Sequence, residues 1–395
     1  MNKIDDLIKQ YCPNGVEYDI IKNICNISRG RVMSKEYLRD NIGEYPVYSS
    51  QTVNEGILGK IDTYDYDGEY LTWTTDGANA GSIFYRTGKF SITNVCGLLK
   101  ITNNKVNTKF LHYYLGTVAK NYVNVGMGNP KLMSNVMATI KVAVPPLPVQ
   151  EEIVKVLDAF TALEAELEAE LEARKRQYEY YRNKLLTFDE NTTGGGRIKF
   201  MQLGDVGTFI RGNGLQKKDF TDTGVGCIHY GQIYTYYGTF AERTKSYVSN
   251  ELAEKLKKAQ TGDLIIATTS ENVEDVGKAV AWLGNEDICI GGHSYAFHHN
   301  QNPKYMAYLF QTEAFNQQKK KVVKGVKVID INDSAMSKFK FGFPPLDEQE
   351  RIVAILDKFD SLVNDISEGL PAELTARRQQ YEYYRNKLLT FDEAA

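Results

Sequence analysis

A fourteen-residue stretch occurs twice in this chain without a single change. The sequence QYEYYRNKLLTFDE fills residues 177–190 and again residues 380–393. Each copy closes a segment that opens with Pro-Pro-Leu, at residues 145–147 and at residues 344–346. A duplication of this kind restricts the chain to folds that use the same element twice.

Both duplicated segments carry apolar side chains at every third or fourth position, which is typical of a helix with one apolar face. The first set is Ile153, Leu157, Phe160, Leu167, Leu171, Tyr178, Tyr181 and Leu185, and the second is Ile352, Leu356, Phe359, Val363, Ile366, Leu374, Tyr381, Tyr384 and Leu388. Each Pro pair ends a strand and fixes where the helix can begin. From Gln150 to Phe188 the first helix spans roughly 58 Å at ~1.5 Å per residue. We expect the two helices to pack as an antiparallel pair; a dimerisation coiled coil is the simpler alternative.

The repeat extends beyond the helices. Ile198-Lys199-Phe200 follows the pattern of Val16-Glu17-Tyr18, and Arg211-Gly212 repeats Arg29-Gly30. The chain is therefore predicted as domain, helix, domain, helix, with bounds at residues 1–149, 150–190, 191–343 and 344–395. A flexible linker is expected at residues 192–196, Thr-Thr-Gly-Gly-Gly.

Strand patterns dominate the interior of each domain. We expect a helix at residues 2–11, strands at 45–50, 69–74, 82–86, 90–101 and 138–144, and a helix at 108–122. The middle of the first domain, TWTTDGANAGSIFYRTGKF, differs from the middle of the second, IIATTSENVEDVGKAVAWL. The starts and ends of the two domains match while their middle sequences differ, which indicates one scaffold used twice to bind two different targets.

The composition excludes several classes. No run of apolar residues is long enough to span a membrane, and the N-terminus has no signal-peptide core. Five scattered cysteines favour a reducing cytoplasm with buried thiols over disulfides or a zinc site. Both domains carry a small excess of Lys and Arg, whereas both helical segments are acidic, which suits a polyanion bound by the domains.

The two domain starts, the two boundaries PPL…QE.I…LD.F and the two ends QYEYYRNKLLTF resemble a type I restriction–modification specificity subunit. The run LEAELEAEL at residues 163–171 resembles the four-residue spacer repeat of one subgroup. The resemblance implies an α+β fold, with two α/β target-recognition domains separated by two long antiparallel helices in a pseudo-two-fold, circular internal repeat. It also implies double-stranded DNA as ligand, each domain binding half of a split target. The implied partners are methyltransferase subunits, two of them expected, and a restriction and translocase subunit, with S-adenosylmethionine and ATP bound by those partners and no cofactor in this chain.

The chain lacks motifs for catalysis of its own. An adenine methyltransferase needs Asn-Pro-Pro-aromatic and a Gly-rich cofactor loop, and Asn129-Pro130-Lys131-Leu132 is interpreted as a turn. Gly212-Asn213-Gly214 lacks the third Gly of a dinucleotide loop. His293 and His299 share a strand face without a Cys, so a DNA-facing or merely polar role is favoured over metal binding. No catalytic residue and no metal site is predicted.

Candidate DNA contacts fall into two groups. For phosphates we expect cations near the repeated frames: Arg29, Arg31, Lys35, Arg211, Lys217, Lys218, Lys319, Lys320, Lys321 and Lys324. For base edges we expect hydrogen-bonding side chains on loops: Trp73, Thr74, Thr75, Asn79, Gln232, Tyr234, Tyr236, Tyr237, Thr269, Ser270 and Asn272. Each Lys is also compatible with a merely solvated side chain, and each Tyr with a core position.

The main alternative is a coiled-coil scaffold protein with two protein-binding domains. A self-contained methyltransferase is the third hypothesis, and the missing motifs argue against it. Affinity for duplex DNA with a steep salt dependence separates the first two functions.

Overall fold

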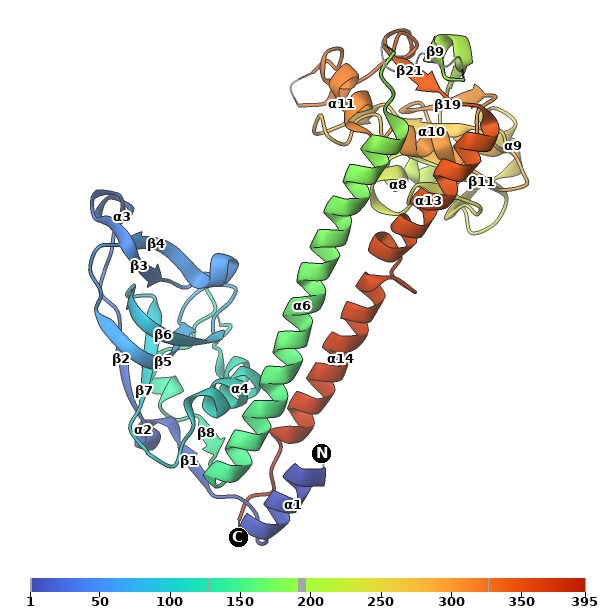
Figure 1. The fold of residues 1–395 in the computed structure, drawn as a ribbon. Coiled ribbons are helices and arrows are strands. Elements are labelled where there is room, and N and C mark those ends of the chain that lie inside the picture. Colours follow the sequence, from blue (N-terminus) through green and yellow to red (C-terminus); the bar gives the residue numbers. More distant parts are fainter. Residues whose placement is uncertain (1, 127, 191–196, 326, 395) are drawn as a thin grey trace. The chain divides into compact units, whose positions relative to one another are not determined.

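The computed structural model describes residues 2–126, 128–190, 197–325 and 327–394. The chain divides into two compact units, Met1–Leu167 with Leu374–Ala395, and Glu168–Glu373 (Figure 1). Each unit therefore contains one domain, the first part of one helical segment and the last part of the other. The predicted linker at residues 192–196 lies outside the described residues.

The first unit is built on a six-stranded sheet with the order β2-β7-β5-β6-β3-β4 and a separate pair, β1-β8. Its strands are β1 Tyr18–Ile20, β2 Cys25–Arg29, β3 Ile42–Tyr48, β4 Ile57–Ile61, β5 Tyr66–Thr74, β6 Ile83–Ile92, β7 Cys96–Ile101 and β8 Lys141–Ala143. Its helices are α1 Asn2–Tyr11, α2 Ile21–Ile24, α3 Lys35–Asp40, α4 Thr108–Val118, α5 Ser134–Met137 and the N-terminal part of α6 Leu147–Leu186, with short 3-10 turns η1 Val53–Gly56 and η2 Ala119–Tyr122.

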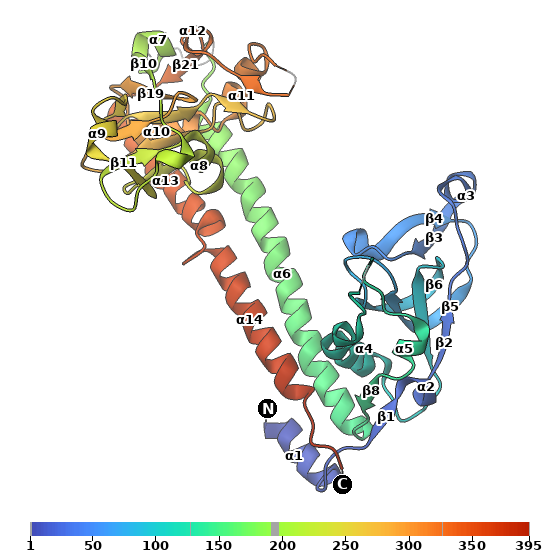
Figure 2. The ribbon, with the colours of Figure 1, turned by 180° about the vertical axis from the view of Figure 1, so that it is seen from behind.

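Within this unit α4 lies between the sheet and α6 (Figure 2). Asn107 caps the N-terminus of this helix, and its side chain accepts a hydrogen bond from the Phe110 amide. Its apolar face, with Phe110 and Leu111 fully buried, belongs to one core together with Leu71 of β5 and Ile153 of α6. The apolar spacing of α4 thus fastens the helical segment to the sheet.

The second unit has a five-stranded sheet, β10-β19-β15-β17-β12, a four-stranded sheet, β13-β11-β18-β14, and two pairs, β16-β20 and β21-β9. Its strands are β9 Lys199–Gln202, β10 Gly207–Arg211, β11 Val225–Ile228, β12 Phe240–Ala241, β13 Ser246–Val248, β14 Lys258–Ala259, β15 Leu264–Ala267, β16 Thr269–Ser270, β17 Ala279–Trp282, β18 Ile288–Ile290, β19 Ser294–His299, β20 Ile329–Asp330 and β21 Lys340–Phe343. Its helices are α7 Leu203–Val206, α8 Tyr230–Thr235, α9 Asn250–Ala253, α10 Pro303–Leu309, α11 Glu313–Lys320, α12 Asp333–Met336, α13 Leu346–Asn364 and the C-terminal part of α6, with one 3-10 turn, η3 Lys217–Asp219.

The duplication is visible at the level of single contacts. Asp158 of α6 accepts hydrogen bonds from Lys109 and Tyr113 of α4, at 2.6 and 2.7 Å. In the second unit, Asp357 of α13 accepts the same pair of bonds from α10, from Lys304 at 2.8 Å and Tyr308 at 2.6 Å. Equivalent bonds therefore hold each domain to the helix that follows it.

A buried glutamine repeats in the same way. Gln150 accepts from the Asn107 amide and donates to the Pro145 carbonyl. Gln349 accepts from the Asn302 amide and donates to the Pro344 carbonyl. Each glutamine thus ties the first turn of its long helix to the N-cap of the domain helix and to the Pro pair.

The helical segments pack antiparallel within each unit. In the first unit the Phe160 ring stacks on Tyr384 at 5.6 Å, and Glu164 pairs with Arg378 at 2.6 Å. The partner number falls as the α6 number rises, which defines an antiparallel pair with α14 Leu370–Leu388. In the second unit, Phe359 stacks on Tyr181 at 5.5 Å. The predicted α+β fold with long antiparallel helices is confirmed.

The C-terminal segment differs from the prediction of one continuous helix. It breaks between Asn364 and Leu370, where Asp365 accepts hydrogen bonds from the Ser367 and Glu368 amides. Ile366, predicted on the apolar face, is 85% exposed because it lies in this break. The break absorbs the four extra residues that the second segment has between its Pro pair and the repeat (344 to 380, against 145 to 177).

Strand bounds were predicted less well than strand existence. Residues 82–86 and 90 belong to one strand, β6, which continues through Ile92, and β7 begins only at Cys96. Of the strand expected at residues 138–144, only Lys141–Ala143 is extended. Ala138 still caps α5, and its amide bonds to the Ser134 carbonyl.

Candidate nucleic-acid interface

In the first unit, the residues directly after β5 pair with a later chain segment around Lys131. The Leu132 amide donates to the Thr75 carbonyl at 2.9 Å, and Lys131 forms isolated antiparallel bridges with both Asp76 and Asn124. Residues directly opposite one another on antiparallel strands present their side chains on the same face. Asp76, Lys131 and Asn124 therefore share one face, and we call them the first ladder.

Positive charge surrounds the acid of the first ladder. The Arg29 guanidinium, at the end of β2, donates to Thr75 Oγ1 at 2.6 Å and lies 3.6 Å from the Asp76 carboxylate. Lys131 Nζ lies 3.8 Å from the same carboxylate, and its side chain is 52% exposed. Two cations around one carboxylate leave a net positive surface that offers hydrogen-bond donors.

The second unit has the same construction with other residues. Asp330 of β20 pairs with Thr269 of β16 and forms an isolated bridge with Lys324. Thr269 Oγ1 lies 3.0 Å from His293 Nδ1 and donates to Asp330 at 3.4 Å. We call Thr269, Asp330 and Lys324 the second ladder.

An aromatic cluster borders the second ladder. The ring of Tyr230, in α8, lies 5.0 Å from that of His293 and 4.5 Å from that of His229. The hydroxyl of Tyr234 donates to the Thr269 carbonyl at 3.0 Å, which joins α8 to β16. Aromatic rings beside hydrogen-bonding groups suit contacts with nucleic-acid bases.

His229 fixes the start of α8. Its Nδ1 accepts from the Gly231 amide at 3.2 Å, and its own amide donates to Gln232. Burial, and then the nearby Lys217, lower the pKa of His229. The ring is therefore neutral at pH 7, which is the state that lets Nδ1 act as an acceptor.

Three of the four base-contact residues predicted in the first domain lie in the core. Trp73 is fully buried, and its ring lies against Gly97 of the neighbouring strand. Its indole N–H donates to the Leu132 carbonyl at 2.9 Å. Thr74 donates to the Asn79 carbonyl, and Thr75 donates to the Val95 carbonyl at 2.8 Å. None of the three side chains offers a surface to DNA. Asn79 is exposed and donates to Thr52.

The predicted phosphate contacts of the first domain are accessible. Arg31 is exposed, donates to Asp65 at 3.1 Å and lies over the Tyr37 ring. Lys35 is exposed at the start of α3, and Arg29 is part of the surface around the first ladder.

The predicted base contacts of the second domain divide into two groups. Gln232 and Tyr237 are buried: Gln232 donates to Ser246, and the Tyr237 hydroxyl accepts from the Lys245 amide. Both side chains support α8 and the loop after it rather than facing a ligand. The others reach the surface, and Tyr236, Thr269, Ser270 and Asn272 lie there with the Tyr234 ring half-buried. Asn272 is held by two hydrogen bonds to Asp275, at 2.8 and 2.7 Å.

Lys319 is the exception among the predicted phosphate contacts of the second domain. Its side chain is 2% exposed, and Nζ donates to the Glu274 carbonyl at 2.8 Å. Burial lowers the pKa of Lys319 to about 8. The position is therefore a core position, while the remaining candidates are exposed: Arg211, Lys217, Lys218, Lys320, Lys321 and Lys324.

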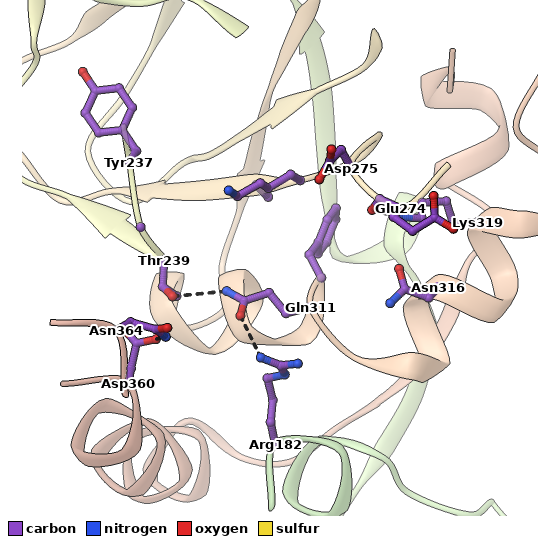
Figure 3. Close-up of a pocket in the computed structure, with 14 residues that line it drawn as sticks. Arg182, Tyr237, Thr239, Glu274, Asp275, Gln311, Asn316, Lys319, Asp360 and Asn364 are labelled. Atoms are coloured by element: carbon purple, nitrogen blue, oxygen red, sulfur yellow. Dashed lines mark hydrogen bonds between the residues drawn. The ribbon is translucent and has the colours of Figure 1, made fainter. Parts of the chain in front are cut away.

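Lys319 lies in the wall of a pocket of about 490 Å³ that is lined by groups of both charges (Figure 3). Gln311 joins two of the lining groups, donating to Thr239 at 3.2 Å and accepting from Arg182 at 3.1 Å. Asp360 accepts from Asn364 at 2.8 Å. Several lining side chains therefore hydrogen-bond to one another. Because the lining carries both charges, the pocket does not suit a polyanion.

The residues of the two ladders and the aromatic cluster that the sequence interpretation did not name as candidates are Asp76, Asn124, Lys131, His229, Tyr230 and Asp330. Lys131 lies in the segment interpreted as a turn, Asn129–Leu132. The usable signal was the repeat itself, because Thr75-Asp76 and Thr268-Thr269 follow equivalent strands. His299 is half-buried and its ring lies beside Phe297, whereas His293 is exposed and contacts Thr269, so the two do not form a joint site.

Other kinds of site find no support in the described part of the chain. Among those residues no three His, Cys, Asp or Glu side chains are grouped to hold a metal ion. No helix in the same residues is both long and apolar enough to cross a membrane. The five cysteines are buried, and burial raises the pKa of Cys25, Cys96 and Cys227 to about 12.

Comparison with known proteins gives a consistent answer. The family model of the type I restriction modification DNA specificity domain matches twice, at residues 13–173 and 197–376. A putative type I specificity subunit of Mycoplasma pneumoniae is 32% identical over 376 residues, covering 94% of this chain and 97% of that protein. A putative type I restriction enzyme specificity subunit of Haemophilus influenzae is also 32% identical, covering 94% of each.

Solved structures share the fold. The type I restriction–modification S subunit of M. genitalium matches with a TM-score of 0.56 at 14% identity, covering 95% of this chain and 96% of that one. A chain from a structure of type I complex assembly and conformational transition matches with a TM-score of 0.61 at 14% identity, covering 95% and 98%. Each family match covers most of one domain and the first part of the helical segment that follows it. This chain belongs to the type I restriction–modification DNA specificity family.

Proposed function

We propose that the chain selects the DNA sequence on which a type I restriction–modification complex acts, with each domain recognising one half of a split target. The observation that supports this most directly is the pair of ladders. An equivalent backbone arrangement carries Asp76, Lys131 and Asn124 in one domain and Thr269, Asp330 and Lys324 in the other. A scaffold that is kept while its exposed polar groups change suits two half-sites of different sequence.

Catalysis and cofactors belong to the partners in this proposal. The chain contributes binding and positioning, while methyltransferase subunits bind S-adenosylmethionine and a restriction subunit uses ATP. Since the substrate is chromosomal or incoming DNA, the complex acts in the cytoplasm.

The exact repeat supports two copies of one partner. The identity of its buried residues, such as Tyr178, is explained by the core. Core packing does not explain why exposed residues are identical too. Tyr180 is 58% exposed and its counterpart Tyr383 is 62% exposed. The neighbouring Glu179 and Lys184 are exposed in one copy, as are Glu382 and Lys387 in the other. We propose that these surfaces dock the same methyltransferase subunit twice.

Binding of duplex DNA at varied salt tests the function. The chain, assembled with its methyltransferase subunits, is expected to prefer one split sequence, with log affinity falling linearly with log salt. Lys321→Gln, at an exposed position outside the ladders, is expected to reduce that slope by about 1 and to weaken all sequences alike. A chain that binds no duplex but retains protein partners would support the scaffold hypothesis instead.

A further inference from the structure

The two ladders hold opposite charges at one equivalent position. Lys131 exchanges backbone hydrogen bonds with Asn124 at 2.8 and 3.0 Å, and Asp330 does so with Lys324 at 2.8 and 3.1 Å. The residue after each ladder position donates to the carbonyl of an equivalent threonine, Leu132 to Thr75 and Ile331 to Thr268. Lys131 and Asp330 therefore occupy the same place in the duplicated scaffold.

Each ladder also holds one group of the opposite charge, Asp76 beside Lys131 and Lys324 opposite Asp330. In the first unit Arg29 lies beside the ladder, so Lys131 and Arg29 present N–H donors around Asp76. In the second unit the Asp330 carboxylate accepts one hydrogen bond from Thr269, which is itself held by His293. That bond orients the carboxylate, and a carboxylate oxygen can accept further hydrogen bonds.

We infer that Lys131 and Asp330 are specificity-determining residues that contact base edges of opposite hydrogen-bonding character. Guanine presents two acceptors, O6 and N7, in the major groove, whereas cytosine presents the N4 amino donor. Lys131 selects a guanine in the half-site of the first domain. Asp330 selects a cytosine in the half-site of the second domain. This inference rests on the proposed function and adds the base at one position of each half-site.

Selection from a randomised duplex DNA library tests the inference. The probe is bound by the full-length chain in complex with its methyltransferase subunits, and the retained duplexes are sequenced. Lys131→Gln is expected to change the preference at one position of the first half-site from guanine to adenine, because Gln pairs with adenine N6 and N7. Asp330→Asn is expected to change cytosine to adenine at one position of the second half-site. Each loss of the original base is expected to be roughly 5- to 150-fold.

Matched variants separate base contact from other effects. Lys131→Arg is expected to keep guanine, because Arg offers the same donors. Lys105→Gln and Asp287→Asn carry the same chemical changes at exposed positions outside the ladders and are expected to leave both half-sites unchanged. Each variant also leaves the other domain's half-site as an internal control of folding.

Two outcomes would overturn the inference. The first is an unchanged base preference in Lys131→Gln and Asp330→Asn. The second is a uniform loss of affinity for all sequences, which marks a phosphate contact. A wild-type complex that selects no sequence contradicts the proposed function itself, and this result is seen before any variant is made.

Discussion

The side chain of Lys319 is buried in the second unit, where its ammonium group lies over the Phe315 ring and donates to the Glu274 carbonyl. Burial disfavours its charged form, which lowers the pKa to about 8 from an ordinary value of 10.5. The neighbouring Lys320 and Lys321 are exposed. Three consecutive lysines at the C-terminal end of α11 thus differ, one being buried and two exposed.

Lys319→Met is expected to raise the free energy of unfolding at pH 7 by about 1–3 kcal/mol. Removing the buried charge regains ~1.4 kcal/mol of stability for each pKa unit by which burial lowers the pKa. Losing the hydrogen bond to the Glu274 carbonyl reduces that gain by about 1 kcal/mol. The unfolded chain binds the proton between pH 8 and 10.5 and the native chain does not, so wild-type stability rises with pH in that window. Urea unfolding at pH 7 and pH 10 measures the difference, which should shrink at the higher pH. DNA affinity should not change; a reduced salt slope would contradict the core assignment.

Two half-buried histidines, His112 and His299, predict a loss of stability in acid. Burial lowers the pKa of His112 and of His299 to about 4. The unfolded chain takes up these protons near pH 6.5, so stability falls as the pH drops from 6.5 to 4. The expected loss is about 1–3 kcal/mol for each histidine.

His112→Phe keeps an aromatic ring beside Tyr85 and Tyr113 and removes the titration. Urea unfolding at pH 7.5 and pH 4.5 should show a smaller loss in this variant than in the wild type. Equal losses in both proteins would mean that His112 is not responsible.

Individual site residues were the hardest feature to predict. A threonine or tryptophan in TWTT can face either side of a strand, and Trp73 is buried because Gly97 of the neighbouring strand leaves room for its ring. The first ladder joins residues 76, 124 and 131, and no local pattern indicates that pairing. Exposed cations such as Lys324 were predictable, because a lysine is seldom buried.

At the scale of elements, the helices follow directly from the sequence. The apolar period and the Pro pairs predicted α6 from Gln150 to Phe188, and it runs from Leu147 to Leu186. The same reasoning missed the break after Asn364, because Ile366 continues the period by coincidence while Gly369 and Pro371 permit a turn. Hydrophobic spacing measures burial and does not exclude a local interruption.

The run LEAELEAEL in α6 gives a prediction about spacing. Inserting Leu-Glu-Ala-Glu after Glu170 keeps the Leu spacing, lengthens the helix by ~6 Å and adds a rotation of about 40° beyond a full turn. One base pair adds ~3.4 Å and roughly 35°. The variant should keep both half-sites and lengthen the gap between them by one base pair, or at most two, as mapped by sequencing of methylated DNA. An unchanged gap would mean that the helices do not set the separation of the half-sites.

A two-residue insertion at the same place is the control. It turns the following helix face by about 200°. Leu171 and Tyr178 would then leave the apolar face that packs in the second unit. Co-purification should show no assembly with the methyltransferase subunits.

At the scale of the whole molecule, the chain is a circular repeat, in which the C-terminal segment packs in the first unit with the N-terminal domain; we call this the closed repeat. In the first unit the segment after α14 returns to the start of the domain, where Glu393 forms an isolated parallel bridge with Val16. Lys141 pairs with Glu393, and Lys340 pairs with Glu190 in the equivalent place of the second unit. Each domain is thus completed by the helical segment that precedes it in the closed order.

This arrangement predicts that half the chain is sufficient for a symmetric complex. Residues 1–190 keep the first domain and α6 but lose α14, whose Tyr384 and Leu388 cover the apolar face of α6. Two copies can supply that face to each other, so we expect a dimer that directs methylation to a palindrome of the first half-site. Light scattering and methylome sequencing measure both. A stable monomer, or methylation at an asymmetric site, would count against the closed repeat.

Methylome sequencing of cells that carry the full-length chain with its methyltransferase subunits tests the central claim most directly. Two domains that recognise different half-sites predict one asymmetric, split motif with a gap of fixed length, absent from cells without the chain. A continuous motif, a palindromic motif or an unchanged methylome would contradict the account.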